Sequence, residues 1–303
     1  MKKLTFIAVV ACAFLMASCV TQKAEKYAQQ IAELAKTQDE AGYSALKTEM
    51  DAYVAELSVE DTAKFNEAFA KMNDSLLVSP IKARTNEFVQ QTANIMSAGD
   101  KAGAAALKEE ITKYRASLLS DYQVIFNEIY TESIKKQANE FVQQTANVVS
   151  AGDKAGAAAL KEEITKYQAS LLSDYQAIFK EIYTESIKKQ AEVFGSQKVS
   201  IYVKRVKDDN SWKSTESKLK KETSIYIATL PSEYSGIYKK LYNTAYYAAL
   251  KNLAHEYARK ARNSTDWDKT MALQKEWENL VYGIAWNYSY DDAKRLAEYF
   301  NAA

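Results

Sequence analysis

The chain is poor in the residues that build irregular loops, disulfide frameworks and histidine-based sites. Its 303 residues include two prolines, eight glycines, two cysteines and one histidine, His255. Few prolines and glycines favour long helices over loop-rich folds. Beyond residue 18 there is no run of eighteen apolar residues, so no further segment is predicted to span a membrane. The formal net charge of +1 gives no net attraction for nucleic acid, which excludes it as an expected partner.

Motifs of catalytic centres are also missing. The sequence has no glycine-rich phosphate loop, HExxH motif, nucleophile elbow or EF-hand loop. Paired acids occur at Glu109–Glu110 and Glu162–Glu163, but helical neighbours point about 100° apart and cannot share one substrate atom. The sequence therefore predicts a non-catalytic protein with no cofactor and no metal site.

The strongest feature that is present is an internal duplication. Residues 81–133 and 134–186 are identical at 45 of 53 positions. Tandem copying supplies length, valency or surface, whereas a catalytic pocket needs one arrangement of unlike groups. Weaker copies of one helix recur along the chain, each with a glutamate at the same place: Glu49, Glu110, Glu163, Glu222 and Glu276. We predict five repeat units, at 19–80, 81–133, 134–186, 187–245 and 246–303.

Each repeat unit is predicted to contain three helices. From Ile134 to Gly152 the apolar residues advance by alternating steps of four and three, which is typical of a helix seam. Gly152 is placed to end that helix and Asp153 to cap the next one. The third helix starts with a predicted capping box at Ser173–Gln176. Similar boxes are expected at Ser120–Gln123, Ser58–Asp61 and Ser289–Asp292.

No helix breaker separates the third helix of one unit from the first helix of the next. Ile187, Ala191 and Phe194 continue the apolar pattern across such a boundary. We therefore expect an all-α fold whose units share long helices. This sharing is similar to that of spectrin-like rods, although their repeats are about twice as long. An α-solenoid with helices stacked side by side is the alternative.

Two segments strain this pattern. Pro80, after Ser79, removes a backbone donor and should kink or end a helix there. Residues 198–206 alternate polar and apolar residues like a strand, yet they also fit a helix. The repeat register favours the helix.

The extreme N-terminus has the features of a secretory signal. Met1–Lys3 is basic, Leu4–Leu15 is apolar, and the segment ends in Leu-Met-Ala-Ser-Cys at Cys19. The apolar run is too short for a mature transmembrane helix. The ending resembles the lipobox of bacterial lipoproteins, with Met16 where leucine is more usual. An ordinary signal peptide whose cleavage site happens to include Cys19 is the alternative.

The lipobox resemblance implies that residues 1–18 are removed and that Cys19 is diacylated. Two acyl chains anchor a protein stably to a membrane. The non-acidic Val20 after the cysteine suggests the outer membrane within the bacterial cell envelope. Cys12 would leave with the signal peptide, so the mature chain would hold no free thiol and no disulfide.

Aromatic residues are concentrated near the C-terminus. All four tryptophans and twelve of the 21 tyrosines lie beyond residue 200. Rings with polar tips suit protein interfaces and platforms for sugars or peptides, but they also fill cores. The candidate binding residues on this basis are Tyr238, Tyr242, Tyr246, Trp212 and Trp267.

Together these patterns predict a lipid-anchored helical-repeat lipoprotein that acts as a spacer or interaction scaffold. Its aromatic C-terminal units would contact a protein or glycan partner in the envelope. The alternative is a ligand-binding lipoprotein whose aromatic groove takes a glycan, a peptide or a lipid. An enzyme is a third possibility that no motif supports.

Overall fold

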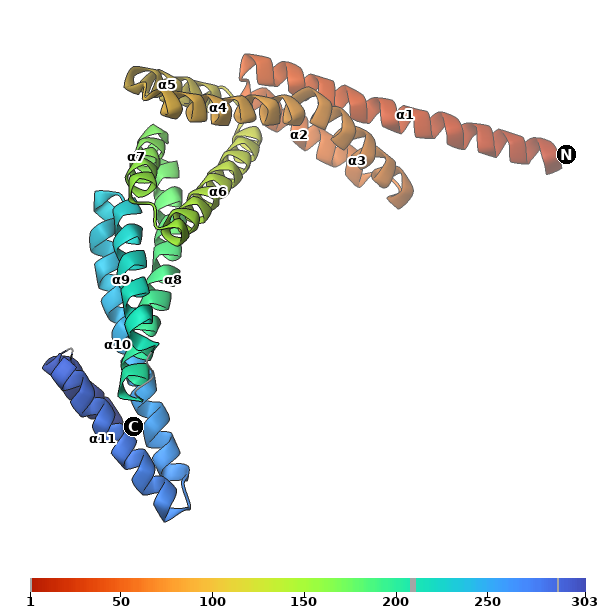
Figure 1. Ribbon diagram of the computed structural model, residues 1–303. Helices are drawn as coiled ribbons and strands as arrows, with labels where there is room; N and C mark the ends of the chain where they lie inside the picture. The colour runs from red at the N-terminus through yellow and green to blue at the C-terminus, as the bar shows by residue number, and fades with distance from the viewer. Residues whose placement is uncertain (1, 208–210, 288) are drawn as a thin grey trace. The chain divides into compact units, whose positions relative to one another are not determined.

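The computed structural model describes the backbone of residues 2–207, 211–287 and 289–303. Side chains are described from Cys19 onward, except those of Met96, Ser97, Lys101, Val206 and Asn287. These ranges are all-α, as predicted (Figure 1). In order, the helices are α1 (Lys2–Thr37), α2 (Glu40–Ala55), α3 (Val59–Asn73), the π-helix η1 (Asp74–Val78), α4 (Ser79–Ala98), α5 (Lys101–Ala116), α6 (Ser120–Ala151), α7 (Lys154–Ser170), α8 (Ser173–Val206), α9 (Trp212–Thr229), α10 (Ser232–Asn263), α11 (Trp267–Asn287) and α12 (Tyr290–Asn301).

Three long helices run through boundaries between the repeat units expected from the sequence. Helix α6 crosses residues 133–134, α8 crosses 186–187 and α10 crosses 245–246. Helix α8 also includes 198–206, so this segment is helical and not a strand. Val199 and Tyr202, three residues apart, are both buried, and only a helix places that spacing on one face.

Pro80 changes the winding of a helix without ending it. The five residues of η1 form a π-helical turn, in which the Ser79 N–H donates to the Asp74 carbonyl. The Pro80 ring cannot donate a hydrogen bond and would clash with the carbonyl four residues earlier. The wider turn makes room for the ring, and the chain continues helically into α4.

The same side-chain cap begins three helices. The carboxylates of Asp39, Asp100 and Asp153 each accept a hydrogen bond at 2.9 Å from the backbone N–H of a glycine three residues later. The cap predicted at Asp153 is therefore confirmed. Gly152, with φ of +70°, ends the preceding helix in the left-handed region that favours glycine.

The predicted serine caps have mixed outcomes. Ser58 and Ser289 accept hydrogen bonds at 3.2 Å from the N–H groups of Asp61 and Asp292. At Ser120 the prediction was wrong, because α6 begins at this residue and its N–H donates at 2.6 Å to a Glu40 carboxylate oxygen. A carboxylate from α2 therefore satisfies this N–H.

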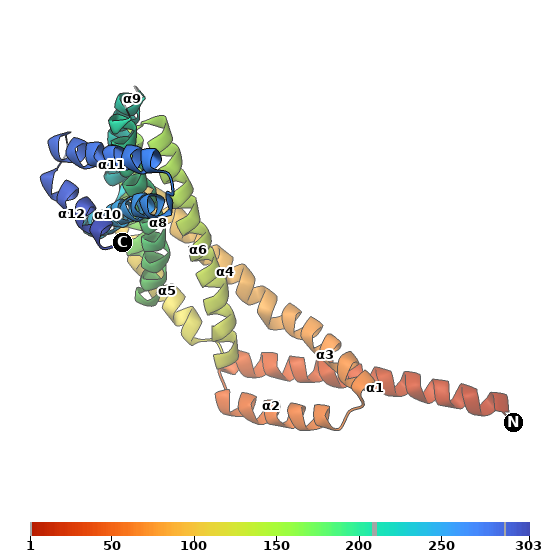
Figure 2. The ribbon, with the colours of Figure 1, turned by 90° about the horizontal axis from the view of Figure 1, so that it is seen from below.

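The chain divides into two compact bodies. The N-terminal body contains residues up to Ile134 with Ser170–Leu172, and the C-terminal body contains the rest. In the C-terminal body α11 and α12 pack against each other and against α10 (Figure 2). Within the described part of the chain, no helix combines the length and the apolar content needed to cross a membrane.

An aromatic quartet recurs in both cores. It consists of one ring from each of two successive helices and two rings, four residues apart, from the helix that follows. Neighbouring centroids lie 5.4 to 6.2 Å apart. The N-terminal body holds Tyr27-Tyr53-Phe65-Phe69 and Phe88-Tyr114-Phe126-Tyr130, and the C-terminal body holds Phe141-Tyr167-Phe179-Tyr183 and Phe194-Tyr226-Tyr238-Tyr242.

Candidate functional site

The three candidate tyrosines of α10 do not form an exposed platform. Tyr238 and Tyr246 are 4% and 3% exposed, so both belong to the core. Tyr242 is partly exposed and stacks on Tyr246, with the ring planes 6° apart. A spacing of four residues places the three rings along one helix face, and that face is turned mainly inward.

The two candidate tryptophans lie on other helices. Trp212, at the start of α9, is partly exposed and packs under the Arg205 guanidinium, which lies 4.3 Å from its ring centroid. Trp267, at the start of α11, is 75% exposed. The five predicted residues therefore do not make a single binding surface.

A cleft of about 880 Å³ in the C-terminal body brings one of the five predicted residues, Tyr242, beside charged groups. It lies between α8 and α9, with Tyr242 of α10 and the first turn of α12 also lining it. Its walls combine cationic and aliphatic side chains. The cations are Lys198, Arg205 and Lys220, and the aliphatic side chains are Ile201, Leu219 and Ile227.

A buried hydrogen-bond network underlies the cleft. The Tyr246 hydroxyl donates to Asp292 Oδ2 at 2.5 Å, and its oxygen lies 3.0 Å from the Tyr202 hydroxyl. Asp292 is 7% exposed, and burial together with this carboxylate raises the pKa of Tyr246 far above its ordinary value. The network ties α8, α10 and α12 together, because each contributes one of these three residues.

Lys198 is the cation nearest to this network. Its Nζ lies 4.1 Å from the Tyr246 ring centroid and 5.9 Å from that of Tyr202. Burial lowers the pKa of Lys198, and the negative charge of Asp292 opposes this shift. Among the described residues, no carboxylate oxygen lies within ion-pairing distance of its ammonium. The cleft thus offers a half-buried cation beside apolar surface.

A second candidate surface is the outer side of α11. Trp267, Met271, Tyr282 and Trp286 are 75%, 44%, 73% and 91% exposed. Residues spaced four or eleven apart lie on nearly the same side of a helix, so these four side chains share one side of α11. We call these four residues the α11 aromatic face. The opposite side of the helix packs into the core through Trp277, Leu280 and Ile284.

Sequence reasoning selected only Trp267 from this face. Helix α11 has apolar residues on two sides, so its periodicity does not tell which side is buried. The exposed rings could have been found by assigning the core side first, because Leu280 and Ile284 fit the seam spacing and Tyr282 does not.

Cys19 is exposed, and the folded core begins immediately after it. Val20, Ala24 and Tyr27 of α1 are buried against Phe65. The signal-peptide segment predicted at 1–18 lies outside the described side chains. The predicted acylation site is thus adjacent to the first core residue, with no linker between them.

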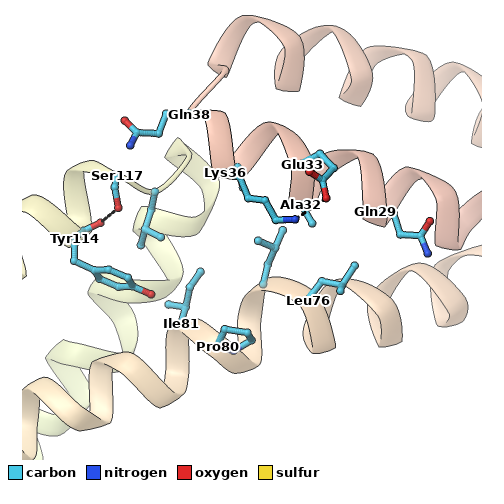
Figure 3. Close-up of a pocket in the computed structure, with 13 residues that line it drawn as sticks. Gln29, Ala32, Glu33, Lys36, Gln38, Leu76, Pro80, Ile81, Tyr114 and Ser117 are labelled. Atoms are coloured by element: carbon cyan, nitrogen blue, oxygen red, sulfur yellow. Dashed lines mark hydrogen bonds and ion pairs between the residues drawn. The ribbon is translucent and has the colours of Figure 1, made fainter.

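A smaller groove of about 430 Å³ lies in the N-terminal body beside η1. Figure 3 shows Leu76, Pro80 and Ile81 along it, with the Tyr114 ring on another side. Its charged groups are already paired, because Lys36 Nζ lies 2.6 Å from Glu33 Oε1. Both charged residues that line this groove, Glu33 and Lys36, thus pair with each other.

Where side chains are described, no three His, Cys, Asp or Glu residues lie close enough together to hold a metal ion. No protein-family model, no curated protein and no solved structure matches the chain.

Proposed function

We propose that the protein is a non-catalytic lipoprotein of the bacterial cell envelope, anchored by acylated Cys19, in which helical repeats act as a spacer or interaction scaffold. The observation that carries the proposal is the lipobox-like segment ending at Cys19, followed at once by a buried residue, Val20. With no flexible tether between them, the acyl chains would hold the first repeat close to the membrane surface. The identity of Val20 favours the outer membrane.

The spacer role rests on the repeats. The aromatic quartet occurs four times, the same aspartate cap begins three helices, and long helices cross the expected unit boundaries. These recurrences support tandem units that share helices, arranged as a spectrin-like rod or as an α-solenoid. Adding copies of such a unit lengthens a protein without changing its ends.

The scaffold role rests on the α11 aromatic face. Large exposed rings with polar tips are enriched at protein interfaces. Trp286 and Trp267 are mostly exposed, and the same helix is held firmly by its buried side. This face is the proposed contact surface for a protein or glycan partner in the envelope.

Replacing Cys19 tests the anchor. In a bacterial host supplied with labelled palmitate, the wild-type protein should incorporate label and enter the detergent phase. Cys19→Ala should do neither, because the acceptor thiol is gone. Cys12→Ala is the matched control, since this cysteine lies in the segment expected to be removed, and it should behave like wild type. Palmitate incorporation by Cys19→Ala would contradict the proposal.

The cleft beside Lys198 favours ligand binding as a second candidate function. Of the predicted aromatic residues, Tyr242 lines it. Its volume of about 880 Å³ falls in the range of sites for small ligands, roughly 300–1,000 Å³.

A further inference from the structure

We infer that the cleft between α8, α9 and the start of α12 binds a small amphipathic anion, a carboxylate joined to an apolar body, with Lys198 contacting the carboxylate. This inference rests on the ligand-binding candidate and is independent of the lipid anchor. Two equivalent helix junctions within the chain differ in the way that this site requires.

In the N-terminal body, a carboxylate closes the junction between α2 and the start of α6. Asp121 Oδ2 accepts hydrogen bonds from the Tyr43 hydroxyl at 2.6 Å and from Lys47 Nζ at 2.7 Å. These two contacts lower the pKa of Asp121, so the acid is held as a carboxylate. At the same junction the Ser120 N–H and hydroxyl both donate to the Glu40 carboxylate.

The repeat register identifies the matching junction in the C-terminal body. The string from Leu46 to Tyr53 aligns with the string from Leu219 to Tyr226, which places Lys220 where Lys47 stands. The string Ser289–Asp292 before and into α12 aligns with the string Ser120–Gln123 of α6, which places Tyr290 where Asp121 stands.

At this second junction Tyr290 stands in place of Asp121, so the carboxylate that bridges the first junction has no counterpart at that position. Tyr290 is 74% exposed, and Lys220 pairs with Glu216 of its own helix at 2.9 Å. The nearby acid of α12, Asp292, is directed inward to Tyr246. The cleft lies at this junction and is lined by both Lys220 and Asp292.

The groups around the cleft define what would fill it. The Lys198 ammonium is half-buried over the Tyr246 ring, and a charge-assisted hydrogen bond to an external carboxylate would satisfy it. Thr223 and Ser224 on the facing wall add hydroxyl donors. Ile227 is 41% exposed and lines the cleft, so it offers apolar surface to the body of the same ligand.

Decanoate is a suitable probe, because it joins one carboxylate to a flexible apolar chain. The protein is residues 19–303 with Cys19→Ser, which keeps every described core residue and removes the acyl chains. Calorimetric titration below the micelle concentration should give saturable binding of decanoate. Decyltrimethylammonium has the same chain and the opposite charge, and it should bind at least tenfold more weakly.

Lys198→Gln should weaken decanoate binding at least tenfold, because it removes the charge and keeps most of the side chain. Lys251→Gln, at an exposed lysine of α10, is the matched control and should bind as wild type. Ile227→Ser should also weaken binding. Because Ile227 is partly exposed, Ile227→Ser should fold. If Lys198→Gln loses its helical circular dichroism, the decanoate affinity of Ile227→Ser becomes the test of the inference.

Absence of saturable decanoate binding to the unsubstituted chain would overturn the inference. Equal binding by Lys198→Gln and wild type, or equal binding of the cationic probe, would also overturn it. None of these results bears on acylation, which the Cys19 variants test separately.

Discussion

At the residue scale, two buried tyrosines of α10, Tyr238 and Tyr246, place their hydroxyls in opposite situations. The Tyr246 hydroxyl donates to the buried carboxylate of Asp292, whereas the Tyr238 hydroxyl is buried without a hydrogen-bond partner among the described residues. A buried hydroxyl without a partner costs free energy, and removing a donor from a buried acid also costs free energy. Deleting the two hydroxyls should therefore have different effects on stability.

Tyr238→Phe should leave the free energy of unfolding unchanged or raise it, because it removes only an unsatisfied group. Tyr246→Phe should lower it by about 1–3 kcal/mol, because the Asp292 carboxylate loses its donor inside the core. Urea denaturation of the two variants beside wild type measures both effects. A Tyr246→Phe variant as stable as wild type would show that the Tyr246–Asp292 bond does not stabilise the fold.

The candidate tyrosines also show where residue patterns stop being informative. Spacing alone puts Tyr238, Tyr242 and Tyr246 on one side of a helix without telling whether that side is buried. Tyr238 and Tyr242 occupy the places of Phe179 and Tyr183 in the preceding quartet, which indicates core. The cleft itself joins residues from Lys198 to Asp292, and only tertiary packing brings these together.

At the element scale, the aspartate caps explain why glycine stands three residues after each aspartate. A Cβ added to Gly156 would lie 2.3 Å from Asp153 Oδ2, and one added to Gly103 would lie 2.4 Å from Asp100 Oδ2. The glycine therefore leaves room for the second carboxylate oxygen of the capping side chain. A larger residue would push the carboxylate away from the N–H that it caps.

Two glycine substitutions separate this effect from helix propensity. Gly236→Ala in α10 meets open space and should raise the free energy of unfolding by up to about 1 kcal/mol. Gly156→Ala in α7 should give no gain or a loss, because the displaced cap costs about 1 kcal/mol. Thermal and urea unfolding of both variants measures the difference. Equal stabilisation by the two would contradict the proposed role of Gly156.

Local sequence signals predicted most of the helices but not every detail of their ends. The cap at Asp153 and the terminating Gly152 could be predicted because the interacting groups are neighbours in the chain. The N-terminus of α6 could not, because Glu40 is 80 residues from Ser120. The π-helical turn before Pro80 was also beyond prediction, since a proline permits a kink, a break or a change of winding.

At the scale of the whole molecule, the duplication makes one repeat removable while 45 of its 53 residue types are kept by the copy that takes its place. Deleting residues 81–133 joins Pro80 to Ile134, which is 1% exposed, in place of Ile81, which is 3% exposed. The Ser-Asp-Tyr-Gln string at 120–123 is replaced by the identical string at 173–176. Asp174 could then accept the hydrogen bonds that Tyr43 and Lys47 now give to Asp121.

The deletion should therefore leave a helical protein that unfolds cooperatively and has lost about the stability of one repeat, because a repeat contacts mainly its neighbours. If the repeats share helices end to end, the longest dimension in solution scattering should fall by about 25 Å, the length of a 17-residue helix. Stacked helices would shorten the particle by a layer or two of about 8–10 Å each. Loss of helical structure after the deletion would mean that the repeats close into one interdependent bundle. Such a bundle cannot be lengthened by copying, and the spacer role would then have to be abandoned.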